Sequence, residues 1–231
     1  MLAVNKMQIA IDGPAGSGKS TAARRVAQAL GYAHIDTGVL YRAVALIALR
    51  QEVDFKDNKT LAILAELPDL EVKLKSNGSP VYFIAGEDVS AELRSPDVNR
   101  KVSQVAKIPA VRSKVTHKLK DLGRQGGIVM DGRDIGTVVL PAADVKIFLT
   151  ADLATRVARR QQELSNKGFS LSVSAVENEM LQRDREDSGR QIAPLKPAPD
   201  AYILDTSDLT AEEVVQKIIS LVKQREQKYK T

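Results

Sequence analysis

The sequence predicts an α/β fold: a doubly wound parallel sheet that carries a small β-containing insert. The first observation is that the apolar run at 8–12 leads through a glycine-rich loop into a helical stretch. The second is that short apolar runs of strand length recur at 127–131, 145–149 and 201–205, which is typical of buried parallel strands. The third is a hairpin signal in the middle of the chain, which does not fit a run of strand–helix units. We therefore expect one domain over 1–231 with an insert.

Length and composition fit a cytoplasmic globular protein. The chain has 231 residues, 43% of them hydrophobic, which is ample for a buried core. It has no cysteine, which excludes disulfides, thiol catalysis and zinc–thiolate sites, and with only His34 and His117 we expect no histidine metal cluster. No uncharged run approaches the roughly 18 residues of a membrane span, and a first strand near Met7 leaves no room for a signal peptide. We expect no membrane partner, and a monomer by default.

The charge pattern points to small anionic ligands rather than nucleic acid. The net charge is +5, basic and acidic residues are interleaved, and aromatic residues make up only 4%. A nucleic-acid binder with a stacking platform would carry more positive charge and more aromatic residues. Local arginine clusters suit small phosphorylated molecules, because the guanidinium fork matches phosphate geometry.

The first half of the chain gives clear element boundaries. A helix is predicted over 19–30, stopped by Gly31 at a C-cap position, and a strongly apolar helix over 38–50. Segments 71–75 and 81–84 flank Asn77-Gly78, which favours a hairpin. We expect an insert over about 68–100, followed by helices to about 123 that cover 96–106 and 109–123 and begin at Pro96 and Pro109.

The C-terminal part returns to the strand–helix alternation. A charged helix is predicted after Asp152. Thr210-Ala211-Glu212-Glu213 reads as a capping box that starts the last helix. The apolar positions of that helix repeat with helical period, at Val214, Val215, Ile218, Ile219 and Val222.

Residues 13–20 read Gly-Pro-Ala-Gly-Ser-Gly-Lys-Ser, the pattern G-x-x-x-x-G-K-[ST] placed between a strand and a helix. This order predicts a phosphate-binding loop, whose glycines let several backbone N–H groups point at a phosphate chain. Lys19 can reach the β- and γ-phosphates of ATP, and the Ser20 hydroxyl can ligate Mg²⁺ together with the phosphates. The alternative is a plain glycine turn. The candidate ATP-binding residues of this loop are Gly13, Pro14, Ala15, Gly16, Ser17, Gly18, Lys19, Ser20 and Thr21.

The loop alone does not name a reaction, because GTPases, motor ATPases and small-molecule kinases share it. A GTPase would show Asn-Lys-x-Asp and Asp-x-x-Gly, and neither pattern occurs in the chain. ATP-dependent chemistry on a small molecule is therefore the leading class.

Several downstream motifs carry a resemblance to a known family. They are Asp36-Thr37-Gly38-Val39-Leu40-Tyr41-Arg42, Gly86-Glu87-Asp88-Val89-Ser90, Ser103-Gln104-Val105-Ala106 with Val111-Arg112, Asp131-Gly132-Arg133-Asp134-Ile135-Gly136-Thr137-Val138-Val139, and Arg183-Asp184-Arg185-Glu186-Asp187-Ser188-Gly189-Arg190. With the loop, the chain resembles the bacterial cytidylate kinases over nearly its whole length. The resemblance implies a P-loop kinase core, a nucleoside-monophosphate-binding insert and a helical lid over about 152–170. It also implies phosphorylation of CMP, and of dCMP, by ATP with Mg²⁺. One departure is Leu119-Lys120, where the family often has Gln-Arg.

Residue types and resemblance together assign the acceptor side. Arg42, Arg133 and Arg190 are candidates for clamping the CMP phosphate. Asp134 with Arg112 and Ser103 suits cytosine, because a carboxylate accepts from the N4 amino group while Arg and Ser donate to N3 and O2. The resemblance adds contacts of Arg183 and Asp187 with the sugar, of Thr37 with the nucleotide, and of the lid arginines Arg156 and Arg160 with ATP. The predicted catalytic residues are Lys19, Arg133 and Arg190.

Each assignment has a structural alternative. Arg42 could be a solvated helix arginine, and Arg133 could form an ion pair with Asp131 or Asp134. Ser103 and Arg112 could be a plain helix serine and a surface charge. Arg183, Asp187 and Arg190 fall at i, i+4 and i+7, so a helix would present them on one face, where an exposed ion pair is the alternative. The helix of Arg156 and Arg160 could simply be a solvated charged helix.

Three rival functions remain open on the sequence. A kinase for another nucleoside monophosphate, such as UMP, would share the loop and the arginines. A non-catalytic ATP-binding switch would need no acceptor. An RNA-binding protein, suggested by the positive charge, would show a steeply salt-dependent affinity.

Overall fold

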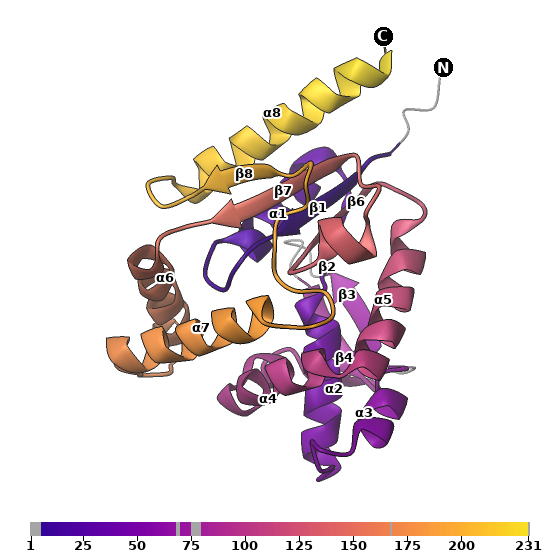
Figure 1. The fold of residues 1–231 in the computed structure, drawn as a ribbon, viewed down its shortest axis with the longest axis vertical. Helices are drawn as coiled ribbons and strands as arrows, with labels where there is room; N and C mark the ends of the chain where they lie inside the picture. Colours follow the sequence, from indigo (N-terminus) through magenta and orange to yellow (C-terminus); the bar gives the residue numbers. More distant parts are fainter. Residues whose placement is uncertain (1–5, 68–69, 75–79, 167, 231) are drawn as a thin grey trace. The chain divides into compact units, whose positions relative to one another are not determined.

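The computed structural model describes residues 6–67, 70–74, 80–166 and 168–230 (Figure 1). The predicted turn Asn77-Gly78, residues 68–69 and 75 of the predicted insert, and residue 167 of the predicted lid lie outside the described residues. The chain divides into two compact units. The first unit comprises Met1–Asp36 and Gly123–Thr231, and the second comprises Thr37–Leu122.

The first unit contains a five-stranded parallel sheet in the order β2-β6-β1-β7-β8. The strands are β1 (Gln8–Asp12), β2 (Ala33–Asp36), β6 (Ile128–Gly132), β7 (Val145–Thr150) and β8 (Tyr202–Asp205). Because β1 lies in the centre, with β6 and β2 on one side and β7 and β8 on the other, the sheet is built outward in both directions. The predicted α/β fold with a doubly wound parallel sheet is confirmed. Strand β2 was not predicted.

The helices of the first unit follow these strands. They are α1 (Lys19–Leu30), a π-helical turn η2 (Ile135–Val139), α6 (Leu153–Ser165), α7 (Val173–Ser188) and α8 (Ala211–Lys230). The capping box is confirmed, since Thr210 N–H donates to Glu213 Oε2 and Glu213 N–H donates to Thr210 Oγ1. Helix α7 ends at Ser188, so the prediction that Arg190 shares one helical face with Arg183 and Asp187 is wrong. The helix ends at the cap residue Gly189, whose N–H donates to the carbonyl oxygen of Arg185, and Arg190 lies beyond this cap.

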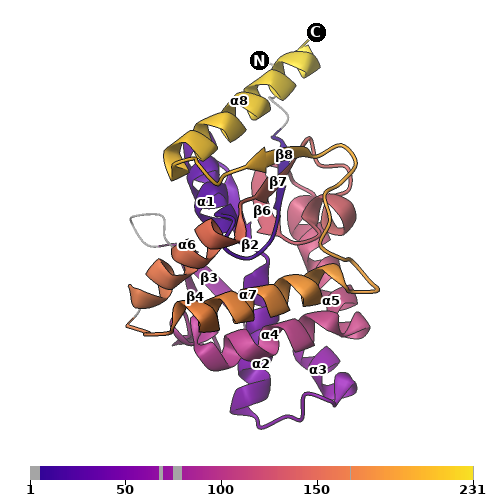
Figure 2. The same cartoon turned by 60° about the vertical axis from the view of Figure 1, so that its left-hand side comes forward.

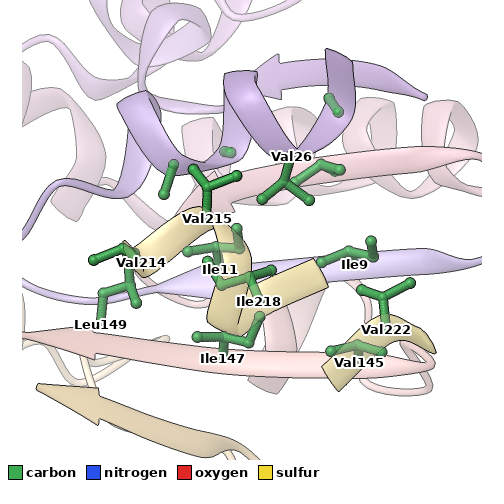
Figure 3. Close-up of a cluster of buried hydrophobic side chains, with 14 of the residues drawn as sticks. Ile9, Ile11, Val26, Val145, Ile147, Leu149, Val214, Val215, Ile218 and Val222 are labelled. Carbon is green, nitrogen blue, oxygen red and sulfur yellow. The ribbon is translucent and has the colours of Figure 1, made fainter. Parts of the chain in front are cut away.

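One hydrophobic cluster packs α1 and α8 together against one face of the sheet of the first unit (Figure 3). Alternate residues of the central strands, such as Ile9, Ile11 and Ile147, point to one face of the sheet, as strand geometry requires. Val26 of α1 and Ile218 of α8 meet them there, and both are fully buried. Figure 2 shows α8 running beside α1 in a second view. The start of the glycine-rich loop is therefore attached to the central strand of the sheet, of which Ile9, Ala10, Ile11 and Asp12 are buried.

The register of the parallel sheet brings several chain segments to one edge. Asp12, the last residue of β1, pairs with Gly132 of β6 and with Phe148 of β7. Parallel strands end on the same side, so the loop after β1 lies next to the segment that begins at Arg133. In open α/β sheets ligands bind outside the carboxyl ends of the strands.

The second unit combines helices with a small antiparallel sheet. The helices are α2 (Gly38–Arg50), α3 (Asn58–Leu64), the 3₁₀ turn η1 (Glu92–Arg94), α4 (Pro96–Lys107) and α5 (Pro109–Gly123), whose last residue already belongs to the first unit. The sheet has the order β3 (Leu70–Leu74), β4 (Pro80–Ile84) and β5 (Glu87–Asp88). The antiparallel pairing of β3 with β4 confirms the predicted hairpin strands. Helix α3 and strand β5 were not predicted.

Local sequence explains the start of α4 and the anchoring of α2. Ser95 caps α4 by accepting from Val98 N–H, and Pro96 occupies the first turn, where its missing N–H is not needed. At the end of α2, Arg50 donates to the carboxylates of Glu87 and Glu92, which ties that helix to β5 and to η1. Among the described ranges, no helix combines the length and apolar character that crossing a bilayer requires.

Candidate active site

The glycine-rich loop adopts a backbone that side chains would not tolerate. Gly13, Gly16 and Gly18 have φ values of 148°, 74° and 87°, in a region that L-residues rarely occupy. A Cβ on Gly13 would lie 2.0 Å from the carbonyl oxygen of Leu149, so the loop passes directly against β7. A Cβ on Gly16 would lie 2.9 Å from the carbonyl oxygen of Arg156. The loop is therefore wedged between β7 and α6, and the reading of this segment as an ordinary turn does not account for these constraints.

Lys19 lies inside the curl of its own loop. Its ammonium donates to the carbonyl oxygen of Pro14 at 2.5 Å and to Ser17 Oγ at 3.4 Å. Only 6% of the residue is exposed. Burial lowers the pKa of Lys19 well below its usual value, and the positive charge of Arg133 lowers it further. An anion placed in this loop would supply the negative charge that a buried ammonium needs.

Ser20 and Asp131 form a pair of oxygen donors beside Lys19. The Ser20 hydroxyl donates to Asp131 Oδ2 at 2.6 Å, and the Asp131 side chain is almost fully buried. Burial acts to raise the pKa of Asp131, but the hydrogen bond from His34 and the nearby charges outweigh it, so the pKa lies below its usual value. An ionised carboxylate next to a hydroxyl is a hard-oxygen donor set, which fits Mg²⁺. A magnesium ion carried by nucleotide phosphates would be held here by Ser20.

Asp12 connects the glycine-rich loop to the segment after β6. Its two carboxylate oxygens accept from the backbone N–H groups of Ile135 and Gly136, each at 2.8 Å. Burial raises the pKa of Asp12 to about 6, and the neighbouring charge of Asp134 acts in the same direction. These hydrogen bonds fix the start of the η2 turn, and with it the position of Asp134, which is itself buried.

Arg133, Asp187 and Arg190 form a buried charge cluster. Arg133 Nε donates to Asp187 Oδ2 at 2.7 Å, and Arg190 donates to Asp187 Oδ1. Asp187 is 1% exposed, and although burial acts to raise its pKa, the charges of Arg133, Arg183 and Arg190 bring it below the usual value. Arg133 does form an ion pair, as the structural alternative expected, and the carboxylate that it contacts here is Asp187. The alternative of an exposed ion pair fails for Asp187, because the residue is buried.

The two predicted lid arginines behave differently. Arg156 is buried, and it donates to Asp184 Oδ2 at 2.5 Å and to the carbonyl oxygen of Ala15 at 3.2 Å. It thus joins α6 and α7 to the glycine-rich loop, which excludes a solvated helix arginine at this position. Arg160 donates to Glu163 at 2.9 Å, one turn further along its own helix. Its role in ATP binding stays a prediction.

The second unit brings together four further predicted residues and one tyrosine. Thr37 and Arg42 lie at the start of α2, Ser103 lies on α4 and Arg112 on α5. Arg112 is only 4% exposed, its guanidinium donates to the carbonyl oxygen of Ala106 at 3.2 Å, and it stacks 5.5 Å from the centre of the Tyr41 ring. Arg112 is therefore not a surface charge. Contact of these residues with CMP stays a prediction.

Sequence reasoning missed several polar contacts around the glycine-rich loop. His34 Nε2 lies 2.7 Å from Asp131 Oδ1. Arg159 donates to both oxygens of Thr206, and the Thr206 hydroxyl lies 3.4 Å from the carbonyl oxygen of Ser17. The only available signal was position, since Thr206 directly follows β8 at the carboxyl edge of the sheet. His34 gave no such signal, because β2 itself was not predicted.

Comparisons with known proteins agree on one family. The family model described as "Cytidylate kinase" matches residues 9–224. A protein named cytidylate kinase from Pelotomaculum thermopropionicum is 48% identical over 214 residues, covering 93% of this chain and 95% of that relative. One of the same name from Bacillus cereus is 47% identical over 217 residues, covering 94% and 96%. Among solved structures, an uncharacterized protein from Eubacterium ventriosum aligns at 12% identity with a TM-score of 0.52 over 94% of this chain and 99% of that chain. That likeness bears on the fold alone.

Proposed function

This chain belongs to the cytidylate kinase family, and from that premise we propose that it transfers the γ-phosphate of ATP to CMP, giving ADP and CDP. We further propose dCMP as a second acceptor. The observation that carries the proposal beyond the family match lies in the first unit. A phosphate-binding loop with a buried lysine is accompanied by a second cationic group, Arg133 and Arg190, held by Asp187. A protein that only bound ATP would have no use for this second group.

The donor side of the reaction falls to the glycine-rich loop. Backbone N–H groups of residues 13–21 and the start of α1 would bind the phosphate chain of ATP. Lys19 would exchange its contact with the Pro14 carbonyl oxygen for phosphate oxygens, where its charge is better compensated. Mg²⁺ bound by the phosphates and Ser20 would neutralise the negative charge that develops on the transferred group. Arg156, already in contact with the loop at Ala15, is placed to add a further positive charge.

The acceptor side requires positioning more than proton transfer. The second pKa of a phosphate monoester is about 6, so the CMP phosphate is mostly dianionic at pH 7 and needs no general base. One of its oxygens attacks the γ-phosphorus, the bond from that phosphorus to the β,γ-bridging oxygen breaks, and ADP leaves. We assign the phosphate contacts to Arg42, Arg133 and Arg190, since guanidinium groups stay charged and bind phosphate in a bidentate manner.

The remaining predicted residues would select and hold the nucleoside. We assign cytosine recognition to Asp134, Arg112 and Ser103, and the sugar to Arg183 and Asp187, with Thr37 as a further nucleotide contact. The buried state of Asp134, Arg112 and Ser103 supports this assignment, because hydrogen bonds to a base discriminate best where water is excluded.

We also propose that two regions close over the bound nucleotides. Residues 152–170 form the lid over ATP, and residues 68–100 with the helices to 123 form the nucleoside-monophosphate-binding region. Their closure would exclude water and so limit hydrolysis of ATP.

A panel of acceptors tests the function directly. ADP release from ATP and Mg²⁺ is measured with CMP, dCMP, UMP and AMP, and we expect the largest kcat/KM with CMP. A larger value with UMP would replace the proposal with the rival monophosphate kinase, and ATP turnover that no acceptor accelerates would favour a nucleotide switch. In Lys19→Ala we expect no detectable transfer and nearly unchanged CMP binding, because the ammonium serves the donor side. Transfer that survived in this variant would refute the role of the loop.

A further inference from the structure

His34 lies on the edge strand β2, where its side chain reaches the buried carboxylate of Asp131. The distance from His34 Nε2 to Asp131 Oδ1 is 2.7 Å, and the two side chains are only 13% and 3% exposed. The other carboxylate oxygen, Oδ2, accepts from the Ser20 hydroxyl at 2.6 Å. Each oxygen of the Asp131 carboxylate therefore has its own hydrogen-bond partner: His34 on β2 for Oδ1, and Ser20 on α1 for Oδ2.

The direction of these hydrogen bonds follows from the ionised state of Asp131. An ionised carboxylate only accepts, so His34 must carry its proton on Nε2 and Ser20 must point its hydroxyl hydrogen at Oδ2. The Ser20 oxygen then keeps its lone pairs available on the side away from Asp131. A hydroxyl oriented in this way can ligate a cation, whereas a hydroxyl free to rotate would have to be ordered first.

We propose that His34 is a positioning residue for the magnesium-carrying nucleotide, acting through Asp131 and Ser20. His34 fixes the plane of the Asp131 carboxylate, and the carboxylate fixes the Ser20 hydroxyl. The proposal rests on the proposed function only in that a magnesium–nucleotide complex binds in the glycine-rich loop. It does not depend on which acceptor is phosphorylated, nor on whether transfer occurs.

Nucleotide binding with and without metal provides the decisive comparison. The affinity for ADP is measured by calorimetry in the presence of Mg²⁺ and again with EDTA, for the wild type, His34→Leu and His34→Gln. We expect His34→Leu to bind magnesium–ADP about tenfold more weakly, the size of effect that loss of one hydrogen bond to a charged group produces, while metal-free ADP binds as before. His34→Gln should restore most of the affinity, because its amide can present an N–H to Asp131 Oδ1.

His117 offers a matched control, since it is the only other histidine of the chain and its side chain is 78% exposed on α5. His117→Leu should change neither affinity. An equal loss of both affinities in His34→Leu would mean a general structural role, and no loss of magnesium–ADP affinity would refute the proposal outright.

A second readout needs no variant and no nucleotide. Nitrogen-15 NMR of the histidine rings distinguishes a proton on Nε2 from one on Nδ1, and we expect His34 with a proton on Nε2 at pH 7.5. A neutral ring carrying its proton on Nδ1 would contradict the proposal even if His34→Leu failed to fold. If the wild type bound ADP and its His34 ring carried the expected proton, but no phosphate passed from ATP to CMP, the proposed function would be wrong and this proposal would stand.

Discussion

Asp187 accepts hydrogen bonds from two arginines at once, from Arg133 Nε at 2.7 Å through Oδ2 and from Arg190 through Oδ1. The three residues come from two places in the chain, the end of β6 and the end of α7. The Asp187 carboxylate thus links two cationic side chains, and the negative charges of Asp184 and Asp131 also act on Arg133.

Removal of this carboxylate should strongly destabilise the protein. In Asp187→Ala the guanidinium groups of Arg133 and Arg190 lose the buried carboxylate that they contact, and breaking a buried ion pair in this way typically costs about 3–5 kcal/mol. The free energy of unfolding, measured in urea, should fall by about that amount. Asp97→Ala is the control, because Asp97 and its partner Arg100 are both about two-thirds exposed, and such pairs contribute little. Similar stabilities of Asp187→Ala and Asp97→Ala would contradict the expectation.

Asp12 should make the protein less stable as the pH rises from 4 to 7. Its pKa is about 6 in the folded protein, whereas an ordinary aspartate, as in the unfolded chain, has a pKa of 3.8. Between these two pH values the folded state therefore binds more protons than the unfolded state. Stability is therefore lost as the pH rises through this window, by about 3 kcal/mol in total. In Asp12→Asn this contribution is absent. The difference in unfolding free energy between Asp12→Asn and the wild type should thus change between pH 4 and pH 7. A difference that stays constant over this range would show that Asp12 does not titrate there.

Gly13 should be irreplaceable for steric reasons. In Gly13→Ala the new Cβ would lie 2.0 Å from the Leu149 carbonyl oxygen, so the loop or β7 must move. We expect a loss of about 4 kcal/mol in unfolding free energy, from overpacking and backbone strain together, and a loss of ATP binding. Gly31→Ala separates the two effects, because Gly31 has a φ of 66° but open space around it. That variant should cost only about 1 kcal/mol, and equal costs would exclude the steric explanation.

Asp134 should determine the preference for cytosine. A charged hydrogen bond to N4 of the base is worth about 10- to 100-fold in kcat/KM, so Asp134→Ala should lose that factor with CMP and much less with UMP. Asp134→Asn provides a sharper test, since its amide can donate to the O4 of uracil and should shift the preference toward UMP. Equal losses with both nucleotides in Asp134→Ala would remove Asp134 from base recognition.

The sequence predicted the elements whose signals are local. The run 8–12 is apolar and followed by glycines, Pro96 and Pro109 mark helix starts, and Thr210 begins a capping box; each lies where it was expected. Strand β2 escaped prediction because its sequence Ala-His-Ile-Asp is short, mixed in polarity and located at the edge of the sheet. The π-helical turn η2 also gave no periodic signal, since it is set by the two hydrogen bonds to Asp12.

The sequence predicted which residues belong to the candidate site, but not which residues they contact. The motifs identified Lys19, Arg133 and Asp187, but the partners of these residues depend on distant parts of the chain. His34 and Asp131 are 97 positions apart, and Arg133 and Asp187 are 54 apart. No periodicity or spacing links residues over such intervals, because their contacts depend on the register of the parallel sheet and on the packing of α7.

The central position of β1 has a consequence for folding during synthesis on the ribosome. Both neighbours of β1, the strands β6 and β7, are translated only after the whole second unit, Thr37–Leu122, has been made. Until then Ile9 and Ile11 have no strands to pair beside and no α8 to cover them, whereas every internal contact of the second unit is already available. The glycine-rich loop is thus translated well before the strands that support it. A chain translated only as far as residue 125 would contain the whole sequence of the second unit, while β1 would still lack both of its neighbouring strands.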